Sequence, residues 1–178
     1  VAEITNKEYK QIEDYITEVQ QNEGLKNHIK NAVLTGDEFY KADTQARYGR
    51  RLGWYALVRA LKPEVVIETG VDKGLGACII TAALIENNKE NAAGYYYGTD
   101  INPKAGYFLK NQYADFGEII YGDSIETLKN FGKKIDLFIN DSDHSAEYEA
   151  NEYQTIKDKL SEKAVIIGDN SHCTDKLF

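Results

Sequence analysis

Residues 64–76 read EVVIETGVDKGLG, and this stretch decides the fold class. It begins with a short apolar run rich in β-branched residues, which is typical of a strand, and the helical pattern of residues 74–85 follows it. Three glycines fall between strand and helix, where the backbone has to turn sharply and can approach a ligand closely. The stretch therefore predicts the start of a βαβ unit.

The alternation of strand and helix patterns continues to the end of the chain. Further strands are predicted at residues 95–99, 118–121, 135–140 and 164–167, and helices at residues 103–113, 124–131 and 146–160. Runs such as residues 135–139 are almost continuously apolar, as expected of parallel strands that are buried on both faces. We predict an α/β fold built on an open, doubly wound, mostly parallel sheet of five strands.

The first 62 residues predict helices rather than strands. Apolar residues recur at helical spacing in residues 4–20 and 47–61, with breaks at residues 23–24 and 35–37. We expect residues 1–62 to form a helical segment that caps the sheet or closes over a substrate, with residues 39–48 as the candidate lid. Residues 63–178 would form the α/β part of a single domain.

Composition limits the classes of partner. The net charge of -8 and the isoelectric point near 5.0 leave no broad basic face for nucleic acid or anionic lipid. Cys78 and Cys173 form no metal-binding spacing or disulfide framework, which fits a reducing compartment. Neither a secretion signal nor an apolar run of bilayer length is present. We expect a cytoplasmic protein that acts on a small molecule, without nucleic-acid or membrane partners.

Acidic residues follow every predicted strand. In sheets of this kind, functional groups gather outside the carboxyl ends of the strands, near the point where the strand order reverses. The acids at these ends are Glu68, Asp100, Asp123, Asp141 and Asp169. They are therefore the first candidates for a binding site.

The glycine spacing separates two classes of nucleotide site. Gly70, Gly74 and Gly76 follow the order GxxxGxG, whereas dinucleotide sites use GxGxxG. Glu68 would repel a diphosphate but not the cationic amino acid part of S-adenosylmethionine (SAM). Asp100 can accept the ribose hydroxyls of an adenosine, although it could instead cap a helix that starts near Pro103.

Three motifs in order carry a family resemblance. Residues 68–76, residues 100–103 and the pair Gly122-Asp123 resemble the cofactor motifs of class I SAM-dependent methyltransferases. The resemblance spans roughly residues 63–170 and implies a Rossmann-like fold with SAM as cofactor. It implies that Glu68 lies near the methionine end and Asp123 near the adenine. We expect Asp100 to bind the ribose, SAM to lie across the glycine turn of Gly70, Gly74 and Gly76, and Asp141 to lie beside the sulfonium.

The same resemblance implies two further strands beyond residue 178, the last pair antiparallel. The fifth strand would otherwise be an exposed edge, which proteins normally cover. We therefore expect either that the C-terminal strands are missing from this chain or that a partner subunit of a homo-oligomer shields the edge.

Oxygen-bearing side chains follow the fourth and fifth predicted strands. Asp141, Asp169 and Asn170 should converge there, and carboxylate and amide oxygens suit Mg²⁺, although a solvated anionic cluster is the alternative. Asp-x-Asp-His followed by Asp-Asn is similar to the Asp-x-Asp-Lys and Asp-Asn pairs of metal-dependent O-methyltransferases of the catechol and caffeoyl-CoA types. That similarity implies these three residues as Mg²⁺ ligands. The histidine at 144 departs from those enzymes and resembles the macrocin-type, antibiotic-tailoring O-methyltransferases.

His144 is the candidate catalytic base, because a histidine can accept a hydroxyl proton near neutral pH. The alternative is that Asp143 or His144 caps the following helix. His28 and His172 join no constellation and are expected at the surface. The preferred function is metal-assisted O-methylation of a small-molecule hydroxyl by SAM. The rivals are an NAD-dependent oxidoreductase, a non-catalytic SAM-binding module and an N- or C-methyltransferase.

Overall fold

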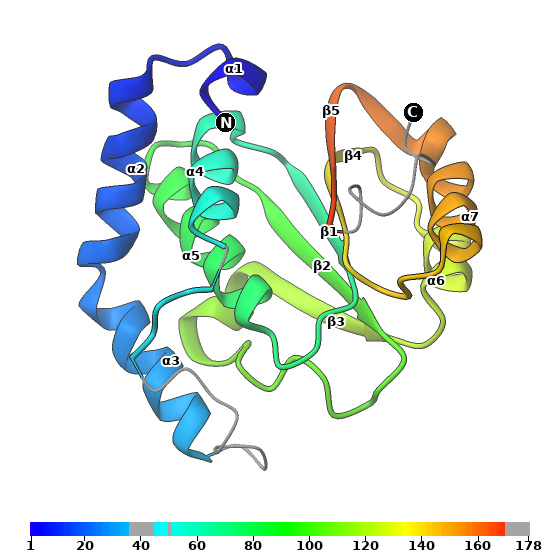
Figure 1. Ribbon diagram of the computed structural model, residues 1–178, viewed down its shortest axis with the longest axis horizontal. Helices are drawn as coiled ribbons and strands as arrows, with labels where there is room; N and C mark the ends of the chain where they lie inside the picture. Colours follow the sequence, from blue (N-terminus) through cyan, green and yellow to red (C-terminus); the bar gives the residue numbers. More distant parts are fainter. Residues whose placement is uncertain (36–44, 50, 170–178) are drawn as a thin grey trace.

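A computed structural model describes residues 1–35, 45–49 and 51–169 of the protein. Its centre is a five-stranded parallel sheet with the order β3-β2-β1-β4-β5 (Figure 1). The strands are β1 (Val65–Thr69), β2 (Tyr95–Asp100), β3 (Gly117–Tyr121), β4 (Ile135–Asn140) and β5 (Leu160–Gly168). The predicted α/β fold with a doubly wound sheet is confirmed. From β1 the chain adds β2 and β3 on one side, and then β4 and β5 on the other side. The carboxyl ends of β1, β2 and β4 therefore lie next to one another at this point of reversal.

Helices cover both faces of this sheet (Figure 1). On one face lie α4 (Leu52–Leu61) and α5 (Leu75–Lys89), with α1 (Ala2–Thr5), α2 (Tyr9–Gln21) and α3 (Glu23–Thr35) packed outside them. On the other face lie α6 (Ser124–Asn130) and α7 (Ala146–Ile156), the latter followed by a short 3₁₀ helix, η3 (Lys157–Lys159). Within the described part of the chain, no helix has both the length and the apolar character needed to cross a bilayer.

Alternating side chains of the strands supply two separate cores. Val66 of β1 packs into the larger core under α4 and α5, whereas Val65 and Ile67 pack into the smaller core under α6 and α7. Successive strand residues point to opposite faces, so both sets must be apolar when both faces are covered. This explains why the strands read as continuous apolar runs.

The helix predicted over residues 103–113 is wrong. Residues 103–108 form turns, and a 3₁₀ helix, η2 (Asn111–Phe116), follows. The Gly106 N–H donates to the Asp72 carbonyl at 2.7 Å and the Phe108 N–H to the Lys73 carbonyl at 3.0 Å. These bonds to the glycine turn satisfy the backbone from outside the segment, which replaces the internal ladder of a helix.

Several element boundaries also differ from the predicted ones. The first helical run is divided at Asn6, whose left-handed φ of 52° ends α1. Helix α4 begins at Leu52 rather than at residue 47, because Tyr48 and Gly49 have φ values of 63° and 55°. Strand β5 begins earlier than predicted, at Leu160, and its pairing with β4 contains a register shift. Its predicted shielding by a partner or by further strands stays a prediction.

The assignment of residues 1–62 to a lid or cap also stays a prediction. Most of the candidate lid at residues 39–48 lies outside the described residues. Tyr48 is described and is buried, with its hydroxyl donating to the Val19 carbonyl at 3.2 Å.

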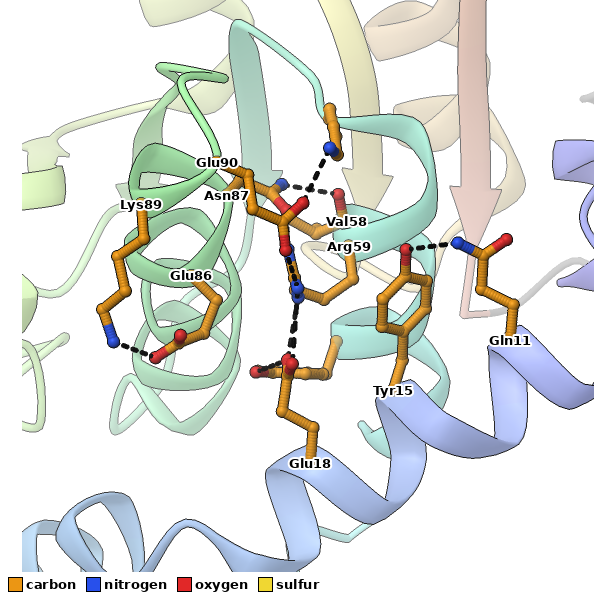
Figure 2. Close-up of polar contacts among 11 residues, drawn as sticks. Gln11, Tyr15, Glu18, Val58, Arg59, Glu86, Asn87, Lys89 and Glu90 are labelled. Carbon is orange, nitrogen blue, oxygen red and sulfur yellow. Dashed lines mark hydrogen bonds and ion pairs between the residues drawn. The ribbon is translucent and has the colours of Figure 1, made fainter.

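Arg59 joins the outer helices to the sheet-packing layer (Figure 2). Arg59 is 3% exposed, and its guanidinium donates to Glu18 of α2 at 2.8 Å and to Glu90 at 2.6 Å, and also to Asn87 of α5. The Asn87 amide in turn donates to the Val58 carbonyl at 2.9 Å. One buried cation on α4 therefore holds α2 and α5 together.

Replacing Arg59 by methionine, which keeps much of the volume, should lower the free energy of unfolding by about 2–3 kcal/mol, since buried polar partners lose their donor. Urea denaturation measures this. Lys10→Met is the matched control, because Lys10 pairs with Asp14 in full exposure on α2 and its loss should not be measurable. Equal stability of the Arg59 variant and the wild type would contradict the assigned role.

Candidate functional site

A cleft of about 630 Å³ opens at the carboxyl ends of the strands. We call it the strand-end cleft. Its described lining includes the residues Arg51, Gly70, Asp72, Thr99, Asp100, Ile101, Asn102, Gly122, Asp123, Ser124, Asp141, Ser142, Asp143, His144 and Tyr148. The cleft thus brings together Gly70, Asp100, Asp123, Asp141 and His144, five of the predicted site residues.

Gly70 sits where the turn after β1 passes the end of β4. Its φ is +83°, and a Cβ atom at this position would collide with the carbonyl oxygen of Asp141. The Gly70 N–H donates to the Thr99 carbonyl and the Asp141 N–H to the Thr69 carbonyl, both at 2.9 Å. Only glycine fits this combination of left-handed backbone and close approach.

Asp100 holds the glycine turn from the other side. Its Oδ2 accepts the N–H groups of Val71 at 3.0 Å and Asp72 at 2.9 Å, and its Oδ1 accepts the Asn102 N–H at 2.8 Å. No helix starts at Pro103, so the alternative of a helix cap there is wrong. A carboxylate has about four acceptor positions, which leaves about one for a ligand hydroxyl.

Asp123 combines a place in the cleft with a capping role. Its Oδ1 accepts the Glu126 N–H at 3.0 Å at the start of α6, and its Oδ2 accepts the Tyr148 hydroxyl at 2.9 Å. These bonds, that from Glu126 above all, lower the pKa of Asp123. The carboxylate therefore stays charged at one end of the cleft.

Asp141 is a half-buried acid at the other end. Burial and the neighbouring Asp169 carboxylate raise its pKa to about 6, while the Arg51 guanidinium opposes that shift. The Arg51 Nη2 lies 3.5 Å from the Asp141 Oδ2. Asp141 is thus an acid whose charge depends on nearby cations.

The proposed cation ligands are only partly described. Asp169 is exposed, and its N–H donates to the Asn140 carbonyl at 3.0 Å, which brings it to the end of β4 beside Asp141. Asn170 lies outside the described residues. Within the described residues, no group of three or more His, Cys, Asp or Glu side chains is arranged to hold a metal ion. The two carboxylates fit a hard cation in chemistry, and the Mg²⁺ site stays a prediction.

His144 is exposed at the rim of the cleft. The N-cap of α7 is Ser145, whose Oγ accepts the Tyr148 N–H at 3.4 Å, so the alternative that His144 caps this helix is wrong. Asp143 supports the cap by accepting the Ser145 N–H at 2.7 Å. The charge of His144 opposes the rise in the pKa of Asp141, as that of Arg51 does.

Glu68 is fully buried and does not line the strand-end cleft. The Tyr96 hydroxyl donates to its Oε2 at 2.5 Å, while its Oε1 has no partner among the described residues. Burial raises the pKa of Glu68 to about 8. A Cβ at Gly76 would collide with this carboxylate, so Gly76 makes room for it.

Gly74 starts α5 with a φ of +92° and contacts the loop at Gly106. Neither Gly74 nor Gly76 lines the cleft.

A second buried acid, Glu152 of α7, was not recognised in the sequence. Its carboxylate accepts the hydroxyls of Thr69 at 3.1 Å and Ser142 at 2.9 Å, as well as the Ser124 hydroxyl and the Asn140 amide. These donors follow or end β1, β3 and β4, so Glu152 ties three sides of the cleft together. The helical spacing of Glu149, Glu152 and Ile156, all buried, could have revealed it.

The comparisons with known proteins agree on one class. A family model described as a methyltransferase domain matches residues 67–171. Among curated proteins, none matches this chain.

Several solved structures are similar in fold. A methyltransferase of Podospora anserina bound to S-adenosylhomocysteine (SAH) is 21% identical with a TM-score of 0.64, over 83% of this chain and 62% of that one. An O-methyltransferase of Bacillus cereus in complex with SAH is 14% identical with a TM-score of 0.57, over 94% and 69%. TomG of Streptomyces achromogenes, an O-methyltransferase of tomaymycin synthesis in complex with SAM, is 15% identical with a TM-score of 0.60, over 83% and 65%. This chain spans less than two thirds of the Podospora protein.

Glu68→Gln tests the buried acid. The folded pKa of Glu68, about 8, exceeds its ordinary value of 4.5, so the folded protein keeps a proton that the unfolded chain releases between these values. The free energy of unfolding of the wild type should therefore fall as pH rises from 5 to 8. Relative to the wild type, the glutamine variant should become more stable by about 3–4 kcal/mol over that interval. Urea denaturation at both pH values measures the gain. An equal difference at pH 5 and pH 8 would rule out the raised pKa.

Proposed function

Since this chain belongs to the family of methyltransferase domains, whose model matches residues 67–171, we propose that it methylates a small-molecule hydroxyl with SAM bound in the strand-end cleft. The observation that carries this proposal is the charge of the cleft. Its described lining holds five aspartates against Arg51 and His144. A sulfonium cation is attracted by such a lining, whereas the diphosphate of NAD is repelled.

The arrangement of the lining suggests how SAM would lie. Asp100 and Asp123 would take the adenosine at one end, and the bare backbone of Gly70 would allow the methionine part to cross the turn. The sulfonium would then lie beside Asp141. The SAM in TomG and the SAH in the Podospora and Bacillus proteins support this choice of cofactor.

Methyl transfer would be an in-line displacement. The acceptor oxygen attacks the methyl carbon, and the bond from that carbon to sulfur breaks with its electron pair left on sulfur, which gives SAH. The hydroxyl proton passes to His144 at the rim of the cleft. Most of the acceleration would come from holding the oxygen in line with the methyl group.

Asp141 and Asp169, together with Asn170, are the residues that would hold Mg²⁺. A bound cation there would supply Lewis-acid chemistry that lowers the pKa of the acceptor hydroxyl. The mutual influence of the two carboxylates supports this part of the proposal, because a cation bound between two close acids would relieve their repulsion.

Ligand binding separates the proposal from its first rival. SAM or SAH at a hundredfold excess over its dissociation constant should raise the free energy of unfolding by about 2.7 kcal/mol, and NAD should leave it unchanged. Thermal shift followed by calorimetric titration measures both. Stabilisation by NAD alone would overturn the proposal in favour of an oxidoreductase.

His144→Gln should lower the rate of SAH formation by about 10²–10⁴-fold, because the base is lost, while the SAM dissociation constant stays within twofold. The assay follows SAH with sugar, phenol and macrolide hydroxyl acceptors. His28→Gln is the matched control, since His28 contacts the Phe108 carbonyl at 2.7 Å outside the cleft. Transfer that persists unchanged in chelator would remove the Mg²⁺ component, and SAM binding without transfer to any acceptor would favour a non-catalytic module.

A further inference from the structure

Arg51 is the one lysine or arginine among the described residues that line the strand-end cleft. It comes from the N-terminal part of the chain, directly before α4, and was not among the predicted site residues. Its carbonyl accepts the N–H groups of Trp54 at 3.0 Å and Tyr55 at 3.2 Å, which fixes its backbone at the start of the helix. Its guanidinium lies over the Trp54 ring, 4.9 Å from the centroid. The cation is therefore positioned by the fold.

The guanidinium is incompletely paired. Its Nη2 reaches Asp141 only at 3.5 Å, the limit of a hydrogen bond, and its buried Nε has no partner among the described residues. A guanidinium presents five N–H donors in a planar fork that matches a carboxylate. A buried donor without an acceptor costs free energy, so binding a further anion would stabilise this guanidinium, which has N–H donors left to bind it.

The proposed cofactor brings such an anion to this place. The methionine end of SAM carries an α-carboxylate next to its ammonium and sulfonium groups. In a lining with five aspartates, that carboxylate is repelled on most sides and attracted at Arg51. Asp141, next to which the sulfonium would lie, is the residue that Arg51 approaches.

We propose that Arg51 binds the α-carboxylate of SAM and so selects the complete amino acid end of the cofactor. This inference rests on the proposed function. Arg51 touches a part of the cofactor that does not react, so it is a specificity residue. Its fork lets it receive the ligand carboxylate on donors that Asp141 leaves unused.

Calorimetric titration of SAM against decarboxylated SAM tests the inference, because the two ligands share sulfonium and ammonium and differ only in the carboxylate. The wild type should bind SAM about 10- to 100-fold more tightly, the range of a charge-assisted pair. Arg51→Gln should bind both ligands equally, at the weaker affinity. Arg51→Lys should keep an intermediate preference, since it retains the charge without the fork.

Arg47→Gln is the matched control. Arg47 is exposed, donates to Gln45 at 2.9 Å and does not line the cleft, so its variant should keep the wild-type preference. A full preference for SAM in both Arg51 variants would overturn the inference and leave the proposed function standing. If Arg51→Gln does not fold, the lysine variant decides by the same criterion. A wild type that binds neither ligand would overturn the proposed function and this inference with it.

Discussion

The backbone of Gly70 lies against the carbonyl oxygen of Asp141 with no space for a side chain between them. Because of this close approach, the turn after β1 and the loop after β4 together form one wall of the strand-end cleft. Asp100 holds the same turn from β2 through the N–H groups of Val71 and Asp72. The strand-end cleft exists because these contacts hold the ends of β1, β2 and β4 in place around it.

Much of the fold could be predicted because local pattern and long-range packing agree along the strands. The continuous apolar run of residues 135–139 and the acids after each strand identified both the sheet and its functional edge. The helix predicted over residues 103–113 is wrong because the N–H groups of Gly106 and Phe108 donate to Asp72 and Lys73, 34 and 35 residues earlier in the chain, which no local pattern reveals. Arg51 was missed for a similar reason, since it reads as the first turn of a helix and comes close to Asp141, 90 residues later in the chain, only in the folded protein.

The sequence also does not reveal how deeply a charged side chain is buried. Glu68 and Glu152 lie beneath the cleft from opposite faces of the sheet, and both are fully buried. Their surroundings differ: one oxygen of Glu68 has no partner among the residues that the structure describes, whereas Glu152 accepts four hydrogen bonds. Burial raises the pKa of both carboxyls, and at Glu152 the hydrogen bonds from Ser124, Ser142 and Thr69 oppose that rise.

Arg51, which lines the cleft, directly precedes α4, and the buried guanidinium of Arg59 follows about two helical turns later. Arg51 and Arg59 lie about 12 Å apart along the helix. Through Arg59, Glu18 of α2 thus helps to fix the helix that begins at a wall of the cleft, although no atom of α2 lines the cleft.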